Sequence, residues 1–174
     1  MDEENLIQSL KDGDMSAIDE IYRSYSVPAL RTAYLITSER HTAEDVLQDT
    51  FIQCIKSINS LKNNSSFKPW FYKILIRNAY KAVKAQKNII LSEKIYDKAD
   101  TAVYDKYQSE TNVLLNCINA LKPKLRSTVI LFYYNELSIK EISKIMQCPQ
   151  GTVKSRLNTA KKELKKIMEK ERFL

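Results

Sequence analysis

Glycine is almost absent from this chain, which contains only two glycines among its 174 residues. Typical usage is about 7%. Phosphate-binding loops, dinucleotide-binding fingerprints and many-turned β architectures need backbone at positive φ or in close approach to a ligand, and two glycines cannot supply them. Four prolines add few further breaks. The sequence therefore predicts an all-α fold.

Features of membrane, secreted and metal-binding proteins are missing from the sequence. No segment approaches the roughly 18 to 20 uninterrupted apolar residues of a membrane span, and the first residues, MDEENLIQSLKDGD, are acidic. We therefore expect a cytoplasmic protein without direct membrane insertion. The cysteines are far apart and His41 is the single histidine. We expect reduced thiols at Cys54, Cys117 and Cys148, no metal site and no cofactor.

The net charge of +7 is unevenly distributed along the chain. Residues 1–67 carry six basic and 11 acidic side chains, whereas residues 68–88 carry six basic and no acidic ones. Residues 152–174 carry eight basic and three acidic side chains. Two separate basic segments indicate two contacts with a polyanion, because each Lys or Arg beside a phosphate releases condensed counterions. Two solvated helix faces would give the same charge pattern.

Apolar residues at helical spacing predict several helices in the N-terminal half. The clearest runs over residues 43–58, with Thr42 and Asp45 forming a capping-box-like start. Upstream, two helical segments are expected on either side of Pro28. The polar residues 59–66 predict a loop, and another helix is expected to start near Phe67.

The C-terminal half shows the pattern of a helix-turn-helix. The apolar period fades over residues 89–111, which predicts a flexible linker between two helical domains, residues 1–88 and 112–174. In the second domain, a short helix with Ser138 as its N-cap precedes a break and a basic helix expected to begin at Thr152. In such a unit the first helix supports the second, and the second presents its cationic N-terminal side to the major groove of DNA.

Several motifs occur in the same order as in a known family. The stretch AEDVLQDTF at 43–51 is similar to AEDLVQETF, the pattern of a segment of that family called region 2.2. The stretch FKPWFYKI at 67–74 is similar to FRxWLYRI of the family's regions 2.3 and 2.4. The stretch PQGTVKSRL at 149–157 matches PxGTVKSRL of region 4.2. Over nearly its whole length, the chain resembles the extracytoplasmic-function (ECF, group 4) sigma factors of bacterial RNA polymerase, within the sigma-70 family.

The resemblance implies a transcription initiation factor that catalyses nothing itself. It would bind core RNA polymerase, direct it to specific promoters and help to open the DNA. The expected partners are the coiled coil of the largest polymerase subunit, the flap of the second-largest subunit, promoter DNA and a membrane-anchored anti-sigma factor that holds the free, monomeric protein inactive. The residues expected to contact the coiled coil are acidic or amide side chains of the 43–58 helix, namely Glu44, Asp45, Gln48 and Asp49.

By the same resemblance, each half would contact one promoter element. For the −10 element, the candidates for reading a flipped base are Asn63, Asn64 and Ser65, and those for holding the strand backbone are Lys73, Arg77, Lys81 and Lys84. Trp70 lies on the apolar stripe of the same helix, so it is expected in the core rather than as a stacking platform for a base.

The −35 element would be read in the major groove, where Arg can read guanine and Asn can read adenine. Free N–H groups of a first helical turn, here residues 151–153, can bind a phosphate. The −35 candidates are Gly151, Thr152, Lys154, Ser155, Arg156 and Asn158.

At four positions the chain departs from the family pattern. Ala82 and Ala85 stand where Asp and Arg are usual, Gln147 stands where the turn usually has Gly, and Thr159 stands where a basic residue is common. We therefore expect unusual promoter specificity.

Two other functions fit parts of the sequence. A helix-turn-helix regulator whose N-terminal half senses a ligand would bind duplex DNA strongly without polymerase. A small enzyme using Glu44 and Asp45 is disfavoured, because adjacent carboxylates on a helix point about 100° apart and no glycine loop or histidine accompanies them.

Overall fold

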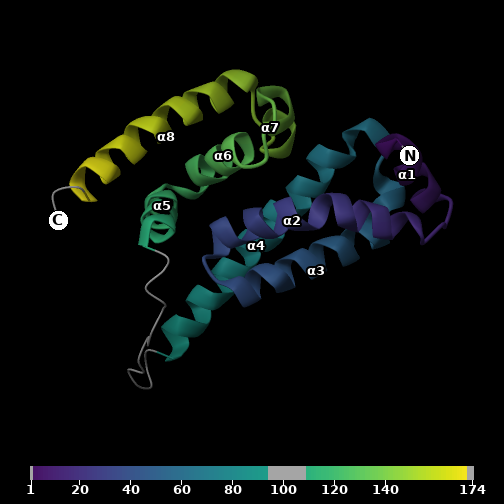
Figure 1. The fold of residues 1–174 in the computed structure, drawn as a ribbon, viewed down its shortest axis with the longest axis horizontal. Helices are drawn as coiled ribbons and strands as arrows, with labels where there is room; N and C mark the ends of the chain where they lie inside the picture. The colour runs from purple at the N-terminus through teal and green to yellow at the C-terminus, as the bar shows by residue number, and fades with distance from the viewer. Residues whose placement is uncertain (1, 94–108, 172–174) are drawn as a thin grey trace.

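A computed structural model describes residues 2–93 and 109–171, and all regular structure in these ranges is helical (Figure 1). The all-α prediction is confirmed. The first range holds α1 (Glu3–Lys11), α2 (Ala17–Thr37), α3 (Arg40–Ser57) and α4 (Phe67–Glu93), with 3₁₀ turns at Ile58–Ser60 and Asn64–Ser66. The second range holds α5 (Ser109–Ala120), α6 (Pro123–Tyr133), α7 (Ile139–Ile145) and α8 (Gln150–Glu171). None of the helices described is long and apolar enough to cross a membrane.

Aromatic side chains hold α2, α3 and α4 together. The Phe71 ring on α4 is fully buried, and its centroid lies 4.9 Å from that of Tyr25 on α2 and 5.3 Å from that of Phe51 on α3. Such tilted ring pairs add to the free energy gained by burying their area. Trp70 is half-buried against this core, with its ring centroid 5.9 Å from that of Phe67. The expected packing role of Trp70 fits these contacts.

Pro28 lies inside one continuous helix, α2, and the prediction of two separate segments is wrong. Proline removes one backbone hydrogen bond and normally kinks or ends a helix. Here the apolar stripe continues without a shift across the proline, with Ile21 and Tyr25 buried before it and Ala29 and Ala33 buried after it. Burial of this shared stripe offsets the lost hydrogen bond.

Glu39 caps α3, which begins at Arg40 rather than at the predicted Thr42 and Asp45 pair. The Glu39 carboxylate accepts hydrogen bonds from the backbone N–H groups of His41 and Thr42 and from the Thr42 hydroxyl. These hydrogen bonds lower the pKa of Glu39. The Thr42 hydroxyl also accepts a hydrogen bond from Gln86 Nε2 at 2.6 Å, so it joins α3 to α4.

Two of the C-terminal helices, α6 and α7, start at residues that the sequence favours for such positions. Pro123 occupies the first turn of α6, where its missing N–H costs nothing. Ser138 and Glu141 form a reciprocal capping box at the start of α7, which confirms the predicted N-cap. The last helix, α8, begins at Gln150, two residues before the predicted start.

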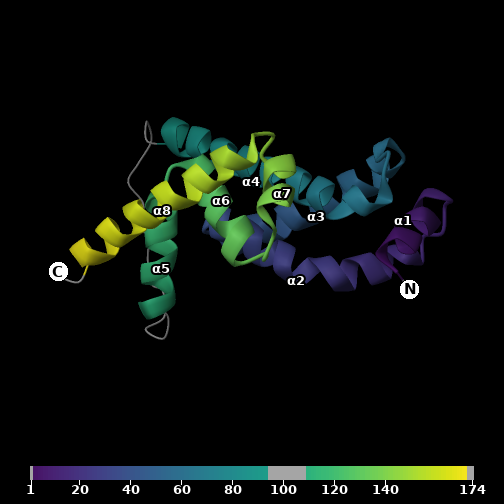
Figure 2. The same cartoon turned by 90° about the horizontal axis from the view of Figure 1, so that it is seen from above.

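The helices before and after the 94–108 gap pack against each other (Figures 1 and 2). α7 lies against α4, and α5 and α6 lie against α2. Buried side chains of both groups, such as Leu75 of α4 and Leu131 of α6, belong to one apolar cluster. We call residues 2–93 the N-terminal unit and residues 109–171 the C-terminal unit.

Candidate nucleic-acid interface

A row of exposed cations follows one face of α4. Lys73, Arg77, Lys81 and Lys84 recur at helical spacing, and all four are exposed, whereas Phe71 and Leu75 on another face are fully buried. No acidic residue occurs between positions 68 and 88. This α4 cationic face, as we call these four residues, can follow the phosphates of a DNA strand.

The loop before α4 presents two of its three predicted base-reading residues at the surface. Asn63 and Ser65 are exposed, and the Asn63 Oδ1 atom accepts hydrogen bonds from the Ser65 backbone N–H at 3.1 Å and hydroxyl at 2.9 Å. Asn64 is half-buried against α1. Its amide donates to the Glu4 carbonyl oxygen at 3.2 Å and accepts from Lys11 Nζ at 2.6 Å. A base would have to displace these contacts to reach Asn64.

Along α8, polar side chains lie outside a buried apolar stripe. Lys154, Ser155 and Asn158 are exposed, and Val153 and Leu157 are buried beneath them. Arg156 is half-buried, and its Nη1 atom donates to the Cys148 sulfur at 3.4 Å, which ties the guanidinium to the preceding turn. Of the predicted −35 residues, Gly151, Lys154, Ser155 and Asn158 are therefore exposed on α8, whereas Thr152 and Arg156 are half-buried.

The first turn of α8 differs from the prediction. The N–H groups of Thr152 and Val153 both donate to the Pro149 carbonyl oxygen, at 2.9 and 3.2 Å. They are therefore not free to bind a phosphate, because the helix starts at Gln150 and these residues already lie within its hydrogen-bonded turns. Gly151 stays exposed in the first turn, with open space where a Cβ would lie.

The acidic face of α3 lies on the surface, as predicted. Asp45, Gln48 and Asp49 are exposed. Glu44 is half-exposed and accepts a charged hydrogen bond from Arg40 Nε at 2.9 Å, so its charge is partly balanced within the helix. Asp45, Gln48 and Asp49 remain as the α3 acidic face.

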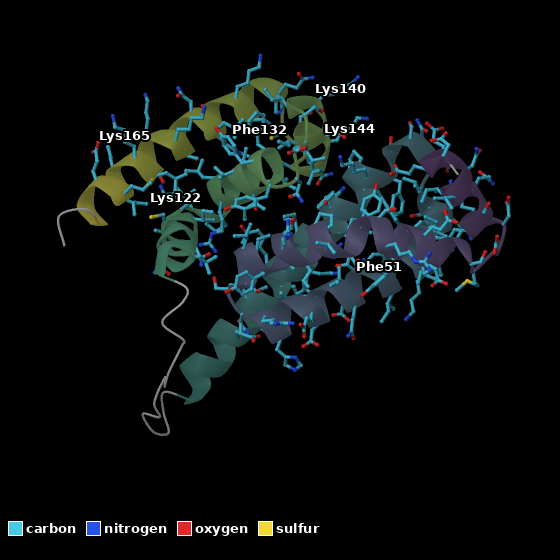
Figure 3. All side chains as sticks on the ribbon, in the orientation of Figure 1. Phe51, Lys122, Phe132, Lys140, Lys144 and Lys165 are labelled. Carbon is cyan, nitrogen blue, oxygen red and sulfur yellow. The ribbon has the colours of Figure 1, made fainter. Side chains whose placement is uncertain are left out.

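The sequence reasoning missed two features of the C-terminal unit. Lys140 and Lys144 are exposed on α7, and Figure 3 shows Lys140 on α7 and Lys165 on α8 pointing outward from the unit. The first helix of a helix-turn-helix crosses the DNA backbone. Basic residues on that helix are therefore the signal that could have identified Lys140 and Lys144. The second feature is an apolar groove of about 630 Å³ between α5, α6 and α8. The residues that line this α8 groove include Val129, Tyr133, Tyr134, Leu164 and Met168.

The thiols lie in different surroundings. Cys54 and Cys117 are buried, and burial raises the pKa of the Cys54 thiol to about 12. Cys148 is half-buried beside Arg156. Within the described ranges, no group of three or more His, Cys, Asp or Glu side chains is placed to hold a metal ion.

Comparison with known proteins shows the family to which the chain belongs. The model of Sigma-70 region 2 matches residues 21–89, and that of Sigma-70 region 4 matches residues 111–164. The RNA polymerase sigma factor YlaC of Bacillus subtilis is 30% identical over 165 residues, which cover 90% of this chain and 94% of YlaC. The chain belongs to the ECF sigma factors. It is a non-enzymatic transcription initiation factor that directs RNA polymerase to promoters.

A second relative supports the same assignment, and a solved structure shares the fold. The ECF RNA polymerase sigma factor SigM of Bacillus subtilis is 33% identical to this sigma factor over 155 residues, which cover 86% of this chain and 94% of SigM. The structure of CnrH in complex with the cytosolic domain of CnrY superposes with a TM-score of 0.79 over 96% of this chain and 97% of that chain. At 15% identity, the superposition shows a shared fold.

Proposed function

We propose that this sigma factor uses one helical domain for each promoter element, with residues 1–88 recognising and melting the −10 element and residues 112–174 binding the −35 element. The observation that carries the proposal is the presence of one exposed basic helix face in each unit, on α4 and on α8. Of the predicted linker, residues 89–93 belong to α4 and residues 109–111 to α5, so a flexible linker would be limited to residues 94–108, which lie outside the described residues.

At the −10 element, Asn63 and Ser65 would read a base that leaves the opened duplex, with Asn64 reached only after its contacts with α1 are broken. The α4 cationic face would hold the backbone of the same strand, because its four cations extend over about three turns of one helix. At the −35 element, Arg156 and Asn158 would read base edges. The remaining −35 candidates, Gly151, Thr152, Lys154 and Ser155, would position α8 on the backbone.

The proposed polymerase contacts lie on other surfaces. The α3 acidic face, with Glu44 at its edge, complements a basic coiled coil, and its charges would steer that encounter. The α8 groove would take an apolar segment of the flap of the second-largest subunit. Tyr133, Tyr134 and Met168 support this placement, because each is at least 42% exposed in the free chain and would be covered on binding.

The free protein would be a cytoplasmic monomer, held inactive near the membrane by a membrane-anchored anti-sigma factor. CnrH, whose structure shares this fold, was solved in complex with the cytosolic domain of CnrY.

Transcription by reconstituted holoenzyme from a template library randomised at both elements tests these assignments. Arg156→Ala is expected to change the base preference at the −35 element alone, and Asn63→Ala at the −10 element alone. Lys166→Ala, which removes an exposed cation from the far end of α8 outside the α8 groove, is the matched control and should leave both preferences unchanged. If both site variants retain the wild-type preferences, the assignment of the units is wrong.

A parallel binding measurement separates this function from that of a ligand-sensing regulator. The sigma factor is expected to select promoter DNA only together with core polymerase. Tight, sequence-specific binding of duplex by the free chain would favour the regulator instead.

A further inference from the structure

Hydrogen bonds connect α1 to the loop that carries the −10 candidates. α1 packs against α2 and against both 3₁₀ turns that precede α4 (Figures 1 and 2). The Lys11 ammonium group, at the end of α1, donates to the Leu61 carbonyl oxygen and to Asn64 Oδ1, both at 2.6 Å. In return, the Asn64 side-chain N–H groups donate to the Glu4 carbonyl oxygen at 3.2 Å and to Gln8 Oε1 at 3.1 Å. The donors of the Asn64 amide and its oxygen are thus all used on α1.

The segment 62–66 depends on such polar contacts for its shape. The structure describes all five residues and none of their side chains is buried, whereas Leu61 before them and Phe67 after them are buried. A segment without an apolar anchor can take many conformations, and ordering it costs entropy. The cap formed by the Asn63 side chain closes only a local turn. The contacts of Asn64 with α1 fix this turn against the rest of the N-terminal unit.

α1 is itself held firmly in place. The buried residues of its apolar face are Leu6, Ile7 and Leu10. In addition, the Tyr25 phenol of α2 donates to a carboxylate oxygen of Glu3 at 2.6 Å, which joins the first turn of α1 to the next helix. These contacts do not involve Lys11, so a substitution at Lys11 can release the loop without releasing α1.

A loop held in this way presents a defined pair of side chains to a base. Asn63 and Ser65 are exposed on either side of Asn64, and they are the residues proposed above to read a base of the −10 element. A binding site discriminates best when its groups are in position before the ligand arrives, because a loose site adapts to competing ligands and loses energy on ordering. The order of the loop therefore bears on which base it selects.

We propose that Lys11 and Asn64 are positioning residues, whose hydrogen bonds tether the −10 loop, residues 59–66, to α1 and thereby set its base preference. Asn64 acts through the shape of the loop and not by contact with the base. The tether follows from the contacts between α1 and the loop, whereas its effect on base preference rests on the proposed function.

Hydrogen exchange of the full-length chain, followed by NMR, tests the tether without DNA. Three backbone N–H groups of the loop report its order, because the N–H of Leu61 donates to the Ile58 carbonyl oxygen and those of Ser65 and Ser66 donate to Asn63. In a loop that has lost its contacts with α1, the protection of these three groups should fall.

Lys11→Met and Asn64→Ala each break the charged hydrogen bond between α1 and the loop. Each is expected to lower the protection of the three reporter groups about 10-fold. Lys62→Met is the matched control, because Lys62 is a lysine of the same loop whose side chain is exposed. It should leave the protection unchanged. Asn64→Ala tests the tether independently if Lys11→Met does not fold.

Transcription by holoenzyme from a template library randomised at both elements tests the effect on base preference. In Lys11→Met and in Asn64→Ala, the preference at one −10 position should fall about 3- to 10-fold, and the −35 preference should be unchanged. The double variant should be no worse than either single variant, because both changes break the same contact. A general loss of stability would lower transcription from all templates and would not change the relative preference.

Two results would overturn the proposal. The first is unchanged protection of the loop in both Lys11→Met and Asn64→Ala. The second is a loss of base preference in Asn64→Ala that Lys11→Met does not share, because Asn64 would then read the base directly.

Asn63→Ala, measured in the same assays, separates this proposal from the proposed function. If Asn63→Ala changes the −10 preference but Lys11→Met and Asn64→Ala do not, the proposed function stands and the positioning role is wrong. If Lys11→Met and Asn64→Ala loosen the loop but none of the three variants changes any preference, the proposed reading of the −10 element by this loop is wrong and the tether stands.

Discussion

Replacement of Gln147 by glycine should stabilise the C-terminal unit. Gln147 lies in the turn between α7 and α8 at φ 49°, the left-handed region that favours glycine. The Cys148 N–H donates to the Ser143 carbonyl oxygen at 3.1 Å, which closes the glycine-type turn that commonly ends a helix. A non-glycine residue in this conformation costs about 1–2 kcal/mol, and glycine loses about 0.5–1 kcal/mol more backbone entropy on folding. The net gain for Gln147→Gly is about 0.5–1 kcal/mol.

Urea unfolding of the full-length chain measures this gain. The Gln147 side chain is exposed, so its removal should cost little packing energy. Gln147→Ala is the matched control, because it also removes the side chain but keeps a Cβ in the left-handed conformation. We expect a higher unfolding midpoint for the glycine variant only. Equal midpoints for the glycine and alanine variants would refute the assignment of strain to this turn.

Three further changes test the sites and the helix caps. Arg156→Ala should cost about 1–3 kcal/mol of promoter binding at one base position, and a series of single-base promoter variants in which the preference stays unchanged would contradict it. Lys81→Ala should weaken promoter opening on all sequences and lower the slope of binding against salt by about one, which a salt titration of the holoenzyme measures. Hydrogen bonds from Thr42 and His41 hold the pKa of Glu39 below its ordinary value of 4.5, so Glu39 stabilises the fold at neutral pH, and this contribution is lost as the pH falls through the lowered pKa. Glu39→Gln should therefore flatten the acid side of the stability profile, measured by unfolding midpoints between about pH 7 and pH 3, and a profile parallel to that of the wild type would argue against this role for the cap.

The helices themselves could be predicted because their signals are local. Apolar spacing identified the core face of α3, and Pro123 and Ser138 marked the starts of α6 and α7. The errors arose where a local signal had more than one possible outcome. Glu39 competed with Thr42 for the cap of α3, and Pro28 was tolerated because packing on both sides of it outweighs the proline penalty.

The contacts between the units left no trace in the sequence pattern. Asn135 is hydrogen-bonded to Thr32, 103 residues away, and to Tyr72, 63 residues away, and a polar residue after a helix ordinarily indicates an exposed loop. The positive φ of Gln147 could not be predicted from the residue itself. The single indication was the family pattern, which usually has glycine at this position.

The exposed basic faces could be predicted because charge clusters mostly remain on the surface. Lys73, Arg77 and Lys81 lie where the helical period puts them. Tertiary contacts decide whether a single polar side chain is available to bind DNA. Asn64, for example, is hydrogen-bonded to α1. The availability of each such residue therefore required the structure.

Run-off transcription with purified core polymerase tests the central claim most directly. With this sigma factor added, genomic promoter fragments are expected to yield transcripts from defined start points, and joint replacement of Lys154 and Arg156 by alanine should abolish them. Core polymerase that ignores the added chain, or that binds it and still starts transcription at random, would contradict the account.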